Sequence, residues 1–296
     1  MKLLTFIRQG TPAIGVKTER GVLDVATAAA AAGREAPSSV MEAIAQGASA
    51  IAALADLAAA APADSSAWLR EDELEFGPCV TEPRKIVCVG LNYRKHAEET
   101  KASIPEYPIL FNKFHNSLAA HGQEIVIPQT TDRLDYEAEL AIVMGRKAKS
   151  VPREQALDHV FGYACANDLS ARDLQLRTTQ WMLGKIGDGF CPLGPYVVTA
   201  DEAGDPNALA IRTFVNGEQR QNSNTSDMIF RCDEIVSYIS RHLTLEPGDI
   251  ILTGTPEGVV LGYPKEKRVY LKPGDVVTIE IERLGSLTNR FAAEEA

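Results

Sequence analysis

The segment 135–143 constrains the fold most, because polar and apolar residues alternate along it with a period of two. This alternation predicts a half-buried strand whose one face carries Asp135, Glu137 and Glu139. Glu137 and Glu139 would lie about 7 Å apart at their Cα atoms, since each strand residue rises roughly 3.3 Å. Two such carboxylates repel each other unless a positive charge lies between them, and a divalent cation would supply it.

The size and charge of the chain narrow the class of protein. Its 296 residues, 45% of them hydrophobic, can form one large domain or one domain plus a small accessory unit. The 40 acidic and 30 basic residues give a net charge of −10, which disfavours nucleic acid or an anionic membrane surface as a partner. The apolar run at residues 3–7 is too short for a signal peptide or a membrane span, so we expect a cytoplasmic location.

Residues 1–80 are expected to form a small N-terminal α/β domain. Their sequence predicts strands at 2–7, 13–17 and 22–25, followed by two or three surface helices broken at Gly33, Pro37 and Gly47. β-branched runs begin at Lys85, so residues 81–296 are expected to form a separate domain. The five cysteines are dispersed without a Cys-x-x-Cys pair, which predicts reduced and buried thiols.

A candidate pair of catalytic residues follows the strand predicted at 85–90. If residues 91–100 form a helix, His96 and Glu99 share one face, three positions apart. A carboxylate beside an imidazole holds its tautomer and raises its basicity, as a general base acting on water requires. A surface salt bridge is the alternative interpretation of this spacing.

A third carboxylate ends the apolar strand predicted at 160–167. Asp168 directly follows this strand, which is a good position for a metal ligand. The next residues predict a helix that Asp168 caps and that presents Arg172 and Gln175 along one side. The glycine-rich loop around Lys185 matches no phosphate-binding pattern, and no dinucleotide fingerprint occurs in the sequence.

Six motifs, in this order and spacing, resemble the fumarylacetoacetate hydrolase superfamily over residues 84–292. Residues 1–80 resemble the small N-terminal domain of its longer bacterial members. The motifs are Gly90-x-Asn92-Tyr93-x-x-His96-x-x-Glu99, Asp135-Tyr136-Glu137-x-Glu139-Leu140, Asn167-Asp168-x-Ser170-Ala171-Arg172-Asp173-x-Gln175, Gly184-Lys185, Pro192-x-Gly194-Pro195 and Thr253-Gly254-Thr255-Pro256-x-Gly258.

The resemblance implies an α+β fold that is mainly β, with a mixed β-roll or sandwich as the C-terminal body and a homodimer as the assembly. It implies an octahedral Mg²⁺ or Mn²⁺ at the carboxylates, and three hard oxygen ligands do favour these cations over zinc. The residue roles that it implies are metal ligation by Glu137, Glu139 and Asp168, substrate contact by Lys185, Arg172, Gln175 and Thr255, and water activation by His96 with Glu99 on a mobile lid.

Such a site would act on a small anionic 2-oxo acid. If the acid chelates the metal, cleavage of its C3–C4 bond leaves a metal-bound enolate that the Lys185 ammonium stabilises. The predicted function is therefore hydrolysis of a 2,4-dioxo acid of the acylpyruvate type to pyruvate and a carboxylic acid.

Three alternatives stay open at this point. The same site would serve decarboxylation of oxaloacetate, or hydration or tautomerisation of a 2-oxo-enoate. The alternative of another class is a non-enzymatic binding protein in which the carboxylates hold a structural metal. Two departures from the family pattern, the loop 187–189 and the pair Phe114-His115, affect which substrate fits.

Overall fold

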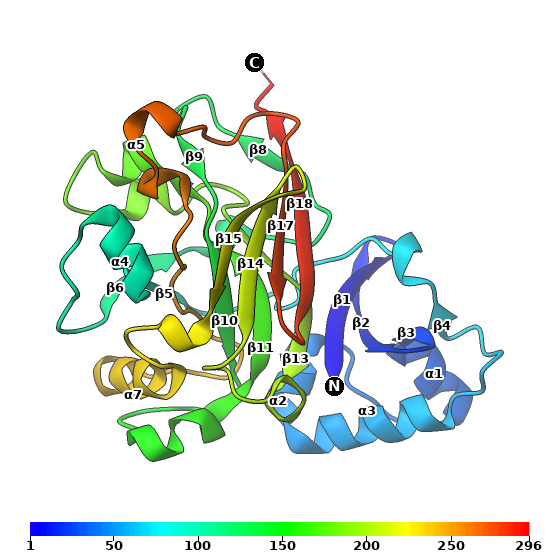
Figure 1. The fold of residues 1–296 in the computed structure, drawn as a ribbon. Helices are drawn as coiled ribbons and strands as arrows, with labels where there is room; N and C mark the ends of the chain where they lie inside the picture. Colours follow the sequence, from blue (N-terminus) through cyan, green and yellow to red (C-terminus); the bar gives the residue numbers. More distant parts are fainter. Residues whose placement is uncertain (296) are drawn as a thin grey trace.

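The computed structural model describes residues 1–295, which form two large sheets and a two-stranded ribbon (Figure 1). In the larger sheet the order is β4 (Trp68–Leu69), β3 (Gly21–Asp24), β2 (Thr11–Thr18), β1 (Lys2–Arg8), β13 (Cys191–Thr199), β11 (Val160–Asn167), β10 (Ala138–Met144), β16 (Ile250–Leu252), β5 (Ile86–Gly90) and β6 (Ile109–Lys113), with β7 (Leu118–Ala119) beside β13. The second sheet is ordered β15 (Glu218–Asn224), β14 (Ala210–Val215), β17 (Val276–Ile281), β18 (Gly285–Ala293) and β8 (Ile125–Ile127). The ribbon pairs β9 (Leu134–Asp135) with β12 (Ser170–Ala171).

The helices of the described chain are short. They are α1 (Val25–Ala32), α2 (Val40–Gln46), α3 (Ala48–Ala60), α4 (Arg94–Thr100), α5 (Arg172–Gln175), α6 (Ala200–Ala203) and α7 (Cys232–His242). The expected class, α+β and mainly β, is confirmed. Within residues 1–295, no helix is both long enough and apolar enough to cross a bilayer.

Strand β10 corrects the first sequence prediction. The segment 135–143 is not one half-buried strand, because β9 ends at Asp135, β10 begins at Ala138, and every residue of β10 is buried. Successive side chains of β10 enter two different hydrophobic clusters. Leu140 and Ile142 pack between the two sheets, whereas Ala141 and Val143 pack on the side of α1, α2 and α3. The alternating residues therefore lie at the end of β10 that faces a pocket, and neither face of this strand is exposed to solvent.

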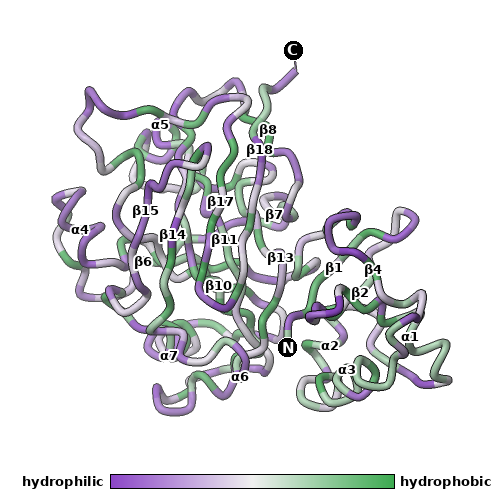
Figure 2. The backbone as a smooth tube through the Cα atoms, turned by 45° about the vertical axis from the view of Figure 1, so that its right-hand side comes forward, coloured by the Kyte–Doolittle hydropathy of each residue, from purple (hydrophilic) through white to green (hydrophobic). Residues whose placement is uncertain are grey.

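The N-terminal elements match the expected strands and the expected helix breaks. The N-terminal strands do not form a sheet of their own, since Lys2 pairs with Val198 and Leu3 with Val197, which joins β1 to β13. Hydrophobic residues prevail along α1 and α3, whose apolar side chains help to cover this sheet (Figure 2). The division of the chain at residue 80 stays a prediction. All five cysteines are free and buried, as expected.

Candidate active site

Three carboxylates lie close together where β10 begins and β11 ends. Ala138 pairs with Asn167 across these antiparallel strands, so the residues on either side of that pair lie next to each other. The Asp168 N–H donates to the Glu137 carbonyl at 2.9 Å. Ligand atoms of Glu137, Glu139 and Asp168 all lie within 4.8 Å of one another, and all three residues are buried. The fold thus brings together the three predicted metal ligands.

Glu137 is the strongly paired member of this cluster. Its two carboxylate oxygens accept hydrogen bonds from Arg172 Nη2 at 2.7 Å and from Lys185 Nζ at 2.8 Å. Lys185 Nζ also donates to Asp168 Oδ2 at 2.8 Å. Burial would raise the pKa of Glu137, but the charges of Lys185 and Arg172 outweigh burial and lower it. The same ion pairs outweigh burial at Lys185 and raise its pKa, so that the ammonium stays charged.

Glu139 differs from its neighbour. It accepts a hydrogen bond from the Gly254 N–H at 2.7 Å, and burial together with the charges of Asp168 and Glu137 raises its pKa well above the usual value. Asp168 Oδ1 forms an ion pair with Lys113 Nζ at 2.7 Å, and Asp168 Oδ2 accepts the hydrogen bond from Lys185 Nζ. Three buried carboxylates, one of which resists ionisation because of burial and of its two neighbours, fit a divalent cation, because hard oxygen ligands favour such an ion and its charge would relieve their repulsion.

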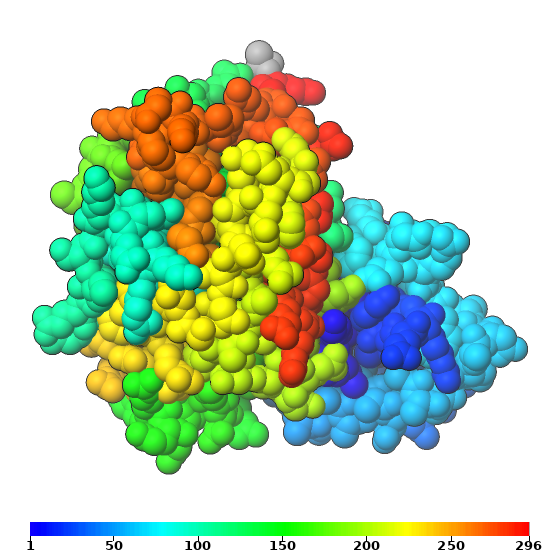
Figure 3. Space-filling model, in the orientation of Figure 1, coloured from blue at the N-terminus to red at the C-terminus, as the bar shows by residue number. Residues whose placement is uncertain are grey.

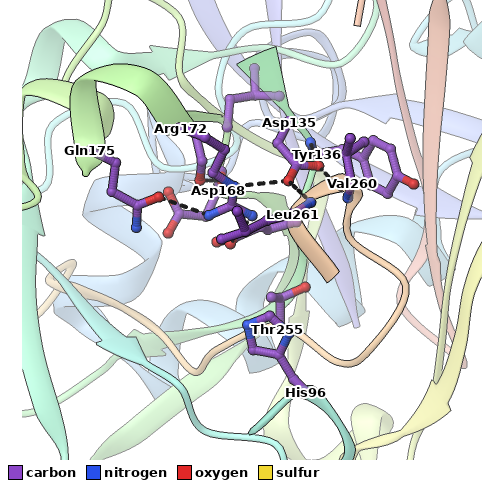
Figure 4. Close-up of polar contacts among 12 residues, drawn as sticks. His96, Asp135, Tyr136, Asp168, Arg172, Gln175, Thr255, Val260 and Leu261 are labelled. Carbon is purple, nitrogen blue, oxygen red and sulfur yellow. Dashed lines mark hydrogen bonds and ion pairs between the residues drawn. The ribbon is translucent and has the colours of Figure 1, made fainter. Parts of the chain in front are cut away.

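Arg172 is held more tightly than the sequence suggests. Its guanidinium donates to Asp135 Oδ2 at 2.8 Å, to Glu137 Oε1 at 2.7 Å and to Gln175 Oε1 at 2.9 Å. The contacts with Asp135 and Gln175 are seen in Figure 4. The prediction that Asp168 caps a helix was wrong. Helix α5 begins only at Arg172, and the Asp168 carboxylate lies beside Lys185 and Lys113 instead.

His96 and Glu99 form the predicted pair on α4. His96 Nδ1 lies 2.8 Å from Glu99 Oε1, and Glu99 Oε2 accepts the Gly258 N–H at 3.0 Å. His96 is only 8% exposed, so the pair is not a surface salt bridge. Thr255 lines the same cavity as His96, and its hydroxyl accepts a hydrogen bond from Gln221 Nε2 at 2.9 Å.

One cavity of about 190 Å³ joins these groups, because Glu137, Glu139 and His96 line it together. Its remaining lining includes the predicted substrate residues Arg172, Gln175, Lys185 and Thr255 and an apolar wall of Val89, Leu91, Ile109, Phe111, Leu176 and Trp181. A larger cavity of about 1090 Å³ lies between the segment 71–76 and the start of β18, which are cyan and red in Figure 3. That crevice is lined by neither the carboxylate cluster nor His96, so size does not identify the active site.

The sequence analysis assigned no role in the site to three residues, Lys113, Asp135 and Trp181. Lys113 is buried at the end of β6 and donates to the carbonyls of Leu169, Lys185 and Phe190, so it supports both sides of the cluster. A lysine inside a short apolar strand was the available signal. Asp135 has the period of the two glutamates, but its partner Arg172 is 37 residues away. Trp181 offered no signal, because its role depends on contact with Phe111 and Gly90.

The sequence of the chain is similar to a known protein family and to characterised members of it. The family model for the C-terminal part of fumarylacetoacetate (FAA) hydrolase matches residues 85–292. The chain is 48% identical over 212 residues to the mitochondrial oxaloacetate tautomerase fahd2 of Xenopus laevis, which covers 71% of this chain and 66% of that protein. It is 45% identical over 224 residues to the mitochondrial oxaloacetate tautomerase FAHD2A of Homo sapiens, with 75% and 71% covered. The chain thus spans about two thirds of the length of these relatives.

Two solved structures resemble the whole described fold. A putative HpcE protein from Mycobacterium smegmatis has a TM-score of 0.84 and 34% identity, with 100% of both chains covered. A maleylpyruvate hydrolase from a Sphingobium species, solved with manganese(II) and pyruvate, has a TM-score of 0.80 and 28% identity, again with 100% of both chains covered.

Proposed function

This chain belongs to the fumarylacetoacetate hydrolase family, and from that premise we propose that it is a divalent-metal-dependent enzyme acting on a small anionic 2-oxo acid. The observation that carries the proposal is that one cavity is lined by Glu137 and Glu139 of the carboxylate cluster and by His96. A structural metal site needs neither a cavity nor an imidazole that faces it, so the non-enzymatic alternative is disfavoured. The printed names of the relatives, oxaloacetate tautomerase and maleylpyruvate hydrolase, support a substrate of this class.

Mg²⁺ or Mn²⁺ would be held by Glu137, Glu139 and Asp168. When bound, the cation would supply Lewis-acid chemistry that draws electrons from the keto group of the substrate. The manganese(II) in the maleylpyruvate hydrolase structure supports a divalent cation here. A homodimer and a cytoplasmic location remain proposals, and the two oxaloacetate tautomerases carry a mitochondrial location in their names.

Lys185 and His96 supply the groups for enolisation. The Lys185 ammonium, held by Glu137 and Asp168, would stabilise the negative charge that develops on the C2 oxygen when C3 loses a proton. Because Glu99 holds Nδ1 of His96, Nε2 is the atom left to accept the C3 proton and to return it. Removal of the proton from C3 and its delivery to oxygen converts the keto form to the enol, and the reverse transfer restores the keto form.

We place keto–enol interconversion of oxaloacetate first among the reactions that share this enolate. The relatives at 45–48% identity support it, since they match most of this chain, including the segments that carry the cluster. Hydrolysis of an acylpyruvate, which the sequence predicted first, becomes the second candidate. The His96–Glu99 pair favours it as well, because the same Nε2 would deprotonate water for attack at C4.

The test follows the enol absorbance of oxaloacetate with the purified protein, in the presence of Mg²⁺ or Mn²⁺ and after chelation. We expect faster interconversion with metal and loss of the acceleration with chelator. A parallel assay measures pyruvate from acylpyruvates of increasing chain length. A protein that accelerates neither reaction with either metal would overturn the proposal.

A further inference from the structure

The segment 254–262, which follows β16, connects the separate parts of the site. Its backbone N–H groups donate to three different carboxylates. Gly254 donates to Glu139 Oε2 at 2.7 Å, and Gly258 donates to Glu99 Oε2 at 3.0 Å. The third carboxylate is Asp135, which accepts the N–H groups of Val260 at 2.9 Å and Leu261 at 3.0 Å (Figure 4).

This segment is itself held firmly. Tyr136 Oη donates to the Gly258 carbonyl at 2.9 Å, and Gln221 Nε2 donates to the Pro256 carbonyl at 2.8 Å. Gly258 has a φ of +101°, and a Cβ there would lie 2.2 Å from the Arg220 carbonyl oxygen. The segment 254–262 therefore provides a fixed surface against which the Glu99 carboxylate rests.

Gly262 is a second part of that surface that faces Glu99. A Cβ added at Gly262 would lie 2.3 Å from Glu99 Cδ, 2.4 Å from Oε2 and 2.7 Å from Oε1. Real Cβ atoms do not approach other heavy atoms below 3.0 Å, so a methyl group at position 262 would have to displace the carboxylate. The φ of Gly262 is not in the left-handed region, so alanine would test space and not backbone strain.

We propose that Gly262 is a positioning residue for the His96–Glu99 pair. The Glu99 carboxylate is fixed by His96 Nδ1, by the Gly258 N–H and by the bare Cα face of Gly262. Displacing the carboxylate turns the imidazole that it orients and moves Nε2 away from the substrate. The kinetic consequence rests on the proposed function, whereas the contact between Gly262 and Glu99 does not.

The kinetic test is a double-mutant cycle of Gly262→Ala and Glu99→Ala. Gly262→Ala is expected to lower kcat by about 10²-fold, as a misplacement of roughly 1 Å does, with little change in KM or in Mn²⁺ affinity. In the Glu99→Ala protein the same substitution should have no further effect, because the carboxylate that the methyl group meets is absent. Unchanged kcat in Gly262→Ala, or an equal loss in both backgrounds, would overturn the inference.

Gly77→Ala is the matched control. Gly77 also lies outside the left-handed region, and its added methyl group would meet the side chain of Thr5 at 2.9 Å, remote from the cavity. This variant is expected to keep the wild-type kcat. A loss as large as that of Gly262→Ala would show that any such methyl group harms the protein, and would count against the inference.

Thermal unfolding of the same variants separates this inference from the proposed function. Gly262→Ala should lower Tm in the wild-type background and lower it less in the Glu99→Ala background, whatever the reaction. An equal shift in both backgrounds would refute the contact even if the enzyme is active. If Gly262→Ala does not fold, recovery of folding by Glu99→Ala supports the inference, and failure of both variants overturns it. An inactive wild type that still shows the coupling would overturn only the proposed function.

Discussion

The two ends of the candidate cavity are held in place by different forces. At the carboxylate end, Glu137 and Asp168 are bound by Lys185 in a buried network of opposite charges. At the other end, Glu99 rests on a backbone N–H and on the bare face of Gly262. Breaking a buried ion pair leaves an uncompensated charge, whereas moving a packed carboxylate changes mainly geometry. Substitutions at the first end should therefore affect folding and metal binding most, and those at the second end should affect rate most.

The largest expected effect is on metal binding, when either Glu137, which forms ion pairs, or Glu139, which forms none within residues 1–295, is replaced. Glu137→Gln and Glu139→Gln should each weaken metal binding by more than about 100-fold, because loss of an outer partner alone typically costs 10–100-fold. Without metal the two should diverge. Glu137→Gln leaves Lys185 and Arg172 short of an anion, at a cost of about 3–5 kcal/mol, while Glu139→Gln removes a carboxylate whose pKa is raised by burial and by repulsion.

Calorimetric titration with Mn²⁺ measures the first of these effects, and thermal unfolding in chelator measures the second. Each variant is the isosteric control of the other, since both replace a buried glutamate two residues apart on the same chain segment. Equal stability of the two metal-free proteins would remove the proposed difference between Glu137 and Glu139.

Substitutions at the dyad should change rate without changing metal binding. His96→Ala is expected to slow hydrolysis or tautomerisation by about 10²–10⁴-fold, the usual contribution of a positioned base. Glu99→Gln should follow it, because the glutamate acts through the imidazole. Decarboxylation of oxaloacetate needs no base and should fall much less, as release of CO₂ would show. An equal fall in every reaction would mean that the pair serves closure of the cavity instead.

The apolar wall should control selectivity with a smaller effect. Trp181 covers Gly90, where an added Cβ would lie 2.3 Å from Cζ3 of the indole, and it meets the edge of Phe111 at a ring distance of 5.6 Å. Trp181→Ala should shift the ratio of kcat/KM values toward bulkier acylpyruvates by roughly 10-fold, since fit in an apolar pocket discriminates by one or two orders of magnitude. Competition between two acylpyruvates of different length measures this ratio, and an unchanged ratio would place the substituent elsewhere.

The smallest expected effect is on the pH dependence of stability, and it comes from His121, which lines the large crevice and not the cavity with His96. Burial lowers the pKa of His121, whose Nδ1 accepts the Thr288 N–H at 3.1 Å in the neutral ring. The unfolded chain therefore binds this proton more readily. The stability due to His121 is present above its usual pKa of about 6.5 and is lost as the pH falls toward the lowered value.

Thermal unfolding of wild type and His121→Gln between pH 5 and about 8 tests this assignment. The variant should lose part of the decline in Tm at low pH and keep full activity, because His121 does not line the cavity with His96. A loss of activity in His121→Gln would contradict the separation of the two regions.

The sequence by itself determined the strands at the N-terminus, the strand that ends before Asp168, the His96–Glu99 spacing and the family. These are local properties, since period-two alternation and short spacings depend only on neighbouring residues. The resemblance to the family also named Lys185, Arg172 and the three metal ligands, because their motifs are short and ordered along the chain.

Only the tertiary structure decided how these groups are held. Asp135 binds Arg172 from 37 residues away, and Gly258 donates to Glu99 from 159 residues away. Asp168 lies against two lysines instead of capping a helix, because the charges that meet in the buried core outweigh a local preference. Strand β10 is buried on both faces because two hydrophobic clusters meet on it, and that depends on which distant segments pack together rather than on its own pattern.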